Sequence, residues 1–142
     1  MLYTVQLSQV KTLPPQTIVI DITVQSSKPP WNIFAPTWEM VKDFKGGRIS
    51  ENQYTEQYMN LMRTRYKDNK EVFQQVIQIA MTGDVALACY CPPEAFCHRH
   101  LLKNIFMSIE PRLQYQREVI PPQSEQIAVN ATLKLGQMLA KK

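Results

Sequence analysis

Residues 89–102, CYCPPEAFCHRHLL, contain every cysteine and every histidine of this 142-residue chain, with an arginine between the two imidazoles. Thiols and imidazoles this close together suit three kinds of structure. These are a metal centre, a reactive thiol beside an anion-binding group, or a packed turn in which the thiols fill the core. The elements expected around the stretch decide how these alternatives rank.

The thiols flank a predicted change from strand to helix. The apolar run at residues 85–91 directly follows a predicted helix, which favours an interior, parallel strand. Pro92 and Pro93 end that strand, and a helix beginning around residues 95–97 turns its leucines inward. Ligands of open α/β sheets bind beyond the carboxyl ends of the strands, so we expect a pocket between Cys91 and Cys97.

Each polar group of this pocket has an expected role. The positive end of a helix dipole lowers the pKa of a thiol, so Cys97 is the expected thiolate and Cys89 an inert core residue. Cys97 or His98 would act as the nucleophile or the proton-transfer group. Arg99, which the helical spacing displaces outward, would hold an anion with the free helix amides and with Cys91.

Two other chemistries match the spacing less well. A phosphatase loop beginning at Cys91 would need its arginine at position 97, where this chain has a cysteine. Structural zinc sites usually present two separated knuckles, whereas here Cys89 and Cys91 lie on one strand and the other candidates follow on one helical turn. We therefore expect neither a metal nor a cofactor. The alternative to a functional site is a purely structural role, in which the thiols are small core residues and His98 is a hydrogen-bonded capping residue.

The rest of the chain predicts a helix-covered sheet. Residues 17–24 are rich in β-branched side chains and predict a mostly buried strand, and shorter strands are expected at residues 3–7 and 115–120. Another helix is expected from Gln123 onward. Candidate caps of three further helices are Thr37, Ser50 and Asn69. This order predicts one α/β domain over residues 1–142, a three-layer sandwich with a small, mostly parallel sheet and a C-terminal helical extension at residues 121–142.

Composition and charge bound the class of protein. With 44% hydrophobic and 20% charged residues the chain is typical of globular proteins, and its net charge of +4 favours acidic partners only weakly. An odd number of cysteines in one short segment does not fit an extracellular disulfide framework. Without a leader-like or membrane-spanning apolar run, we expect a cytoplasmic protein that does not contact membranes.

Several of these motifs resemble one family. LACYC at residues 87–91, FCHRHLL at residues 96–102 and the Ala-Pro-Thr-Trp element at residues 35–38 are similar to the bacterial, archaeal and viral family called domain of unknown function 488. The resemblance spans roughly residues 3–120 and implies a single-domain α/β fold with helices over a small, largely parallel sheet. It also directs attention to Asp21 and Glu118 as site residues.

The residues and the resemblance lead to one hypothesis and one rival. The first is an enzyme acting on an anionic substrate related to nucleotides or nucleic acid, in which Asp21 or Glu118 orients or polarises a partner of the catalytic group. The rival is a non-catalytic module that binds nucleic acid or a protein through basic helices and aromatic side chains, and nucleic-acid binding of that kind should weaken steeply with salt. Trp38 and Tyr54 are expected to contact the ligand.

Overall fold

The computed structural model describes residues 1–120, so the helix expected from Gln123 and the extension at residues 121–142 lie outside the described residues. The elements follow in the order β1 (Leu2–Gln6), η1 (Leu7–Thr12), β2 (Ile18–Asp21), η2 (Trp31–Phe34), α1 (Trp38–Lys45), α2 (Glu51–Asp68), α3 (Lys70–Thr82), β3 (Val85–Cys89), α4 (His98–Ile109) and β4 (Tyr115–Val119). The labels η1 and η2 denote short 3-10 helices, which the sequence did not predict.

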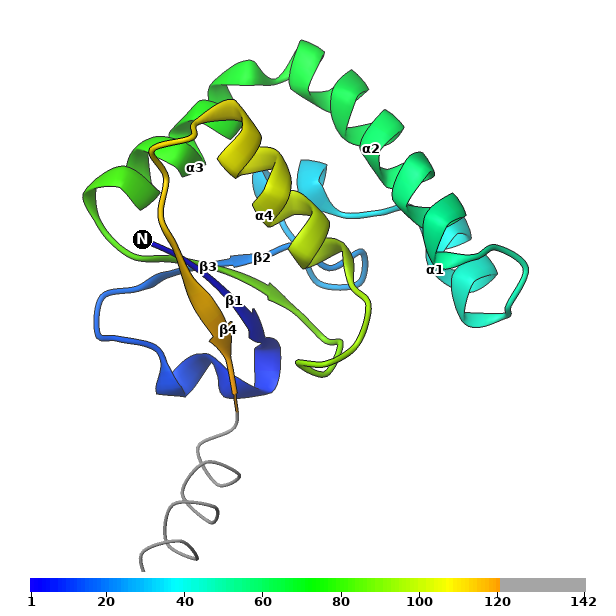
Figure 1. Cartoon of the computed structure of the whole chain (residues 1–142), viewed down its shortest axis with the longest axis horizontal. Helices are drawn as coiled ribbons and strands as arrows, with labels where there is room; N and C mark the ends of the chain where they lie inside the picture. Colours follow the sequence, from blue (N-terminus) through cyan, green and yellow to red (C-terminus); the bar gives the residue numbers. More distant parts are fainter. Residues whose placement is uncertain (121–142) are drawn as a thin grey trace, which may run out of the picture.

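The four strands form one parallel sheet in the order β2-β3-β1-β4 (Figure 1). The interior strands β1 and β3 pair in register from Leu2 with Val85 to Gln6 with Cys89. Every residue of β3 is buried, as expected for an apolar strand with neighbours on both sides. The predicted α/β fold with a small parallel sheet is confirmed, and the carboxyl ends of its strands lie at one edge.

The two faces of the sheet are covered differently. One face packs against α2, α3 and α4, where Leu2 and Leu87 of the sheet join Phe73 and Phe106 of the helices in the main core. The other face presents a smaller apolar cluster that includes Val5 and packs against the segment around η1. Figure 1 shows the α-helices on one side of the sheet and η1 on the other. The larger core therefore lies under the helix layer.

The mostly buried strand expected at residues 17–24 is wrong in extent and in environment. β2 covers only Ile18–Asp21 and lies at an edge of the sheet. Ile18 and Val19 are 43% and 39% exposed, while Ile20 is fully buried against the helices. The apolar composition could not distinguish an edge strand with partly uncovered faces from an interior strand.

Two of the three predicted helix caps are confirmed. The Thr37 side chain accepts a hydrogen bond from the Met40 amide at the start of α1, and Ser50 forms a reciprocal capping box with Gln53 at the start of α2. The cap expected from Asn69 is wrong, because its side-chain amide donates to the Arg65 carbonyl of α2 and leaves α3 without a side-chain cap. Only one residue separates α2 from α3, so Asn69 serves the end of the first helix.

Within residues 1–120, no helix combines the length and the apolar character that a bilayer crossing requires.

Candidate functional site

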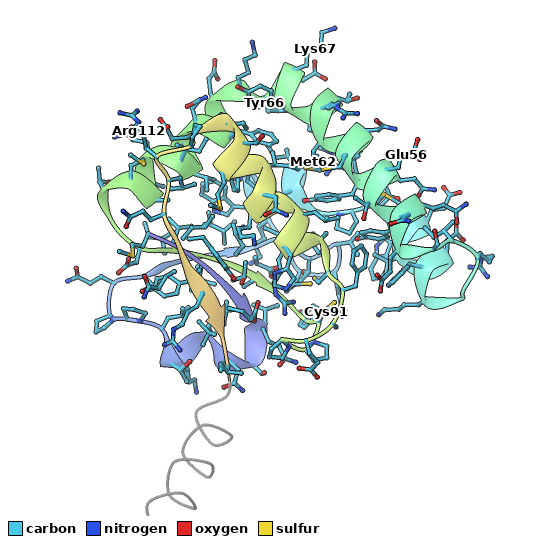
Figure 2. All side chains as sticks on the ribbon, in the orientation of Figure 1. Glu56, Met62, Tyr66, Lys67, Cys91 and Arg112 are labelled. Atoms are coloured by element: carbon cyan, nitrogen blue, oxygen red, sulfur yellow. The ribbon has the colours of Figure 1, made fainter. Side chains whose placement is uncertain are left out.

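A cleft of about 270 Å³ lies at the carboxyl-terminal edge of the sheet. Its lining comes from the segment after β2, the end of β3 and the loop that follows it, the whole length of α1, and the first turns of α2 and α4. Figure 2 shows Cys91 in the segment that leads from β3 to α4. The pocket expected between Cys91 and Cys97 is therefore present, and all three cysteines line it.

The three thiols form one compact cluster inside this cleft. The Sγ atoms lie 3.3 Å apart between Cys97 and Cys89 and 3.9 Å apart between Cys89 and Cys91, and all three are within 4.8 Å of one another. Cys89 and Cys97 are buried, whereas Cys91 is partly exposed, and none is in a disulfide. Cys91 is thus the thiol that a ligand can reach most directly.

His98 lies directly beside the cluster and has a defined tautomer. Its Nε2 is 2.7 Å from the carbonyl oxygen of Ile22, which can only accept, so Nε2 carries the proton. Nδ1 is then an acceptor and lies 3.6 Å from the sulfur of Cys97. Burial lowers the pKa of His98 to about 4, so the imidazole is neutral at physiological pH. A neutral Nδ1 facing a thiol is an available proton acceptor.

The order of thiol acidity differs from the order expected from sequence. Hydrogen bonds from the neighbouring thiols, that of Cys89 first, lower the pKa of Cys91, and the positive charge of Arg99 acts in the same direction. The pKa of Cys97 is raised, because its S–H group is a hydrogen-bond donor to Cys89 and because the group is buried. Cys97 was the expected thiolate, but local donors and burial outweigh the helix dipole, so the charge favours Cys91.

Aromatic side chains form the walls of the cleft. The rings of Phe44, Tyr54 and Phe96 lie in mutual contact, with centroids 5.3 to 5.6 Å apart. Trp38 and Tyr90 also line the cleft and are 51% and 50% exposed, so they form its rim. Burial, followed by the nearby thiols, raises the pKa of Tyr54, which keeps its hydroxyl protonated. Both predicted aromatic contacts, Trp38 and Tyr54, are thus part of this cleft.

The polar part of the lining is small. Thr23, Gln25 and Lys45 contribute to it, and Lys45 is its one basic side chain besides His98. Asp21 does not line the cleft. Its carboxylate accepts hydrogen bonds from the Thr23 amide at 2.9 Å and from the Ser26 hydroxyl at 2.5 Å, and so orders the turn that follows β2. Asp21 therefore positions the segment that carries Thr23 and Gln25.

Arg99 has a different environment from the one expected. The helical spacing placed it outward, but its side chain is fully buried and does not line the cleft. Its Nε donates to Glu118 Oε1 at 2.9 Å, and its Nη1 and Nη2 donate to the carbonyls of Cys91 at 3.0 Å and Pro92 at 2.9 Å. The outward prediction is wrong because Arg99 lies three residues before the buried Leu102, on the inward stripe of α4.

The predicted site residues thus separate into two groups. The cleft brings together Cys91, Cys97, His98, Trp38 and Tyr54. Asp21, Arg99 and Glu118 do not line the cleft, but Asp21 orders the turn after β2 and Arg99, paired with Glu118, holds the loop after β3, and both segments contribute to the lining. Glu118 also lies 3.6 Å from the Nε2 atom of His100, which makes a second polar cluster between α4 and β4.

Sequence reasoning missed several lining residues. Lys45 was one more lysine at the end of a predicted helix, and Phe44, Tyr90 and Phe96 had the spacing of ordinary core or surface residues. For Tyr90 the signal was its position between Cys89 and Cys91 at a strand end, where side chains border a ligand site. Lys45 had no comparable signal, because its position in the cleft depends on how α1 packs beside the sheet.

One comparison with known proteins, that with family models, gives a match. No curated protein and no solved structure matches it significantly. Residues 23–109 match the family model described as the active DUF488-N3 subclade, and this stretch includes Trp38, Tyr54 and the thiol segment but neither Asp21 nor Glu118. Because the matched stretch exceeds half of the chain, the protein belongs to the DUF488 family.

Proposed function

We propose that this protein is an enzyme that acts on a small anionic substrate with an aromatic ring, of the nucleotide type, and that Cys91 is its nucleophile. One observation carries the proposal: the partly exposed Cys91 thiol opens into a cleft whose other walls are aromatic side chains and a lysine. A nucleophile at the base of a small ligand cleft is a common arrangement for covalent catalysis.

The rim of the cleft suits a flat aromatic group next to a negative charge. Trp38 and Tyr90 expose about half of their surface, so either ring can stack on a nucleobase. Lys45 lines the same cleft and can bind a phosphate or carboxylate as a point charge. Arg99 is not assigned this role, since Glu118 and two carbonyl groups occupy its donors.

The chemical step follows from the hydrogen bonds within the thiol cluster. The sulfur of Cys91 forms a bond to an electrophilic carbon of the substrate, and the leaving group departs with the bonding electron pair. Cys91 reacts as the thiolate, and the leaving group takes the S–H proton of Cys97, whose sulfur lies 3.6 Å from the unprotonated Nδ1 of His98. Attack by water on the same carbon then releases the product and the thiolate of Cys91, and a proton from that water returns to the sulfur of Cys97.

Protection of Cys91 from alkylation tests the binding part of the proposal. Reduced protein in a chelating buffer is treated with iodoacetamide in the presence of each of the four common ribonucleoside 5′-monophosphates, and labelling is located by peptide mass spectrometry. We expect at least one nucleotide to slow labelling of Cys91 more than inorganic phosphate or the free nucleoside does. Trp38→Ala and Lys45→Gln should weaken that protection.

Lys67→Gln is the matched control, since this lysine is near the end of α2 and does not line the cleft. Equal labelling with and without every nucleotide would contradict the proposed substrate class. Turnover of the protecting nucleotide by the wild type and not by Cys91→Ser supports the enzyme. Protection without turnover would instead support the non-catalytic binding module.

A further inference from the structure

We propose that Cys89, Cys91 and Cys97 together bind one zinc ion, and that a fourth coordination position of this ion is open to the cleft. Thiolate sulfur is the ligand that selects zinc and copper(I) over harder ions such as magnesium and calcium. Three thiols from two different elements meet here: Cys89 ends β3, Cys91 follows it, and Cys97 caps α4. The sequence analysis expected a zinc site to need two separated pairs of ligands. The fold makes this unnecessary, because it brings three cysteines close in the sequence to one place.

The sulfur positions are close to those of a tetrahedral site. Thiolates bound to zinc at about 2.3 Å lie about 3.8 Å from one another. The cluster has distances of 3.3 Å between Cys97 and Cys89 and 3.9 Å between Cys89 and Cys91, and its widest pair is within 4.8 Å. Small adjustments of the side chains are enough to place all three sulfurs on one ion.

The surroundings of the cluster hold these positions in place. The carbonyls of Cys91 and Pro92 are fixed by the buried guanidinium of Arg99, and Cys89 belongs to an interior strand. Each coordinating thiol gives up its proton to the solvent, and the positive charge of Arg99 lies near the resulting thiolates. Preorganised ligands of this kind favour binding without rearrangement of the backbone.

Three protein ligands leave a tetrahedral ion with one free position. All three cysteines line the cleft, so that position faces the space in which a substrate would lie. An ion held there acts as a Lewis acid on a bound oxygen or nitrogen atom. Because Cys91 cannot be a ligand and a free nucleophile at once, metal-loaded and metal-free protein differ in the group that they offer to the cleft.

Titration with cobalt and zinc tests this site. Reduced, metal-stripped protein is titrated with Co²⁺, which should bind one equivalent, show a thiolate-to-cobalt charge-transfer band and be displaced by Zn²⁺. Cys91→Ser should weaken zinc affinity at least about 100-fold. His100→Gln removes a half-buried imidazole outside the cluster and should leave the affinity unchanged.

Two results would overturn the metal site. One is the absence of a stoichiometric ion with thiolate charge transfer in the wild type, and the other is wild-type zinc affinity in a folded Cys91→Ser variant. If that variant does not fold, alkylation of the wild-type protein tests the site instead. Saturating Zn²⁺ should block the reaction of Cys91 with iodoacetamide, and an unchanged rate would contradict the metal site. Nucleotide protection is measured with chelator present, so the metal site and the proposed function can fail independently.

Discussion

Arg99 of α4 pairs with Glu118 of β4, with the guanidinium Nε 2.9 Å from the carboxylate Oε1. Its side chain is fully buried, and the same guanidinium donates to the carbonyl groups of Cys91 and Pro92. One residue therefore joins β4, the first turn of α4 and the loop that carries the accessible thiol. The sequence predicted that this arginine binds a substrate, but in the structure it holds the loop that carries Cys91.

Arg99→Met should strongly destabilise the protein. The substitution keeps much of the side-chain volume but leaves Glu118 without its arginine partner and two carbonyls without donors, which costs about 3 kcal/mol or more. The free energy of unfolding, measured by urea denaturation, checks this value. Arg112→Met is the matched control, because its pair with Glu110 lies on the surface and its loss should have little effect. Equal stability of the two variants would contradict a structural role for Arg99.

Stability should fall as the pH is lowered through the range in which the unfolded chain protonates His98. Burial lowers the pKa of His98 in the folded protein to about 4, against about 6.5 in the unfolded chain. Between these values the unfolded state binds the proton and the folded state does not, so acidification favours unfolding. At about 1.4 kcal/mol for each pKa unit, the loss approaches about 3 kcal/mol near the lower end of this range.

Urea denaturation across this pH range, with a chelator present, measures the effect. His98→Gln keeps a donor for the Ile22 carbonyl and should remove most of the pH dependence. The pKa of His100 is also lowered by burial, so this residue contributes in the same direction, and His100→Gln serves as the comparison. An unchanged pH dependence in His98→Gln would show that this imidazole does not titrate as its burial implies.

The sequence predicted the local features of the fold well. Apolar runs and capping side chains predicted closely three of the four strands that lie within residues 1–120, and the starts of α1 and α2, because both signals act over a few residues. The edge position of β2 was missed, since strand order depends on packing between distant segments. Asn69 failed as a cap for a similar reason, because two helices compete for it and its side chain ends the first.

The candidate site was predicted in part. The order of strand and helix correctly predicted a pocket at residues 91–97, since parallel strands open their ligand sites at this edge. Arg99 was expected on the outward face of α4 and His98 on the inward face, but both side chains are buried. Which residues of the first turn face inward depends on how α4 packs, and the helical spacing alone does not determine it. The contact between the three sulfurs depends on how the loop folds back, which the spacing of the cysteines does not show.

Tyr58→Phe should destabilise the protein by about 1 to 2 kcal/mol. The hydroxyl of Tyr58 donates to the Phe34 carbonyl at 2.8 Å inside the core, and its removal leaves a buried acceptor without a partner. Thermal and urea denaturation check this value. Tyr66→Phe removes a hydroxyl from a half-buried ring on the same helix and should change stability less (Figure 2). A larger loss in Tyr66→Phe would contradict the importance of the hydrogen bond between Tyr58 and Phe34.

The central claim is that, of the three free thiols that line the cleft, only that of Cys91 is partly exposed, while Cys89 and Cys97 are buried. The most direct test is alkylation of the native, reduced protein by iodoacetamide in the presence of a chelator, with each cysteine quantified by peptide mass spectrometry over time. We predict that Cys91 is modified about 100-fold faster than the other two, because these require local opening of the structure before they react. Preferential modification of Cys97, or equal rates at all three cysteines, would contradict the account.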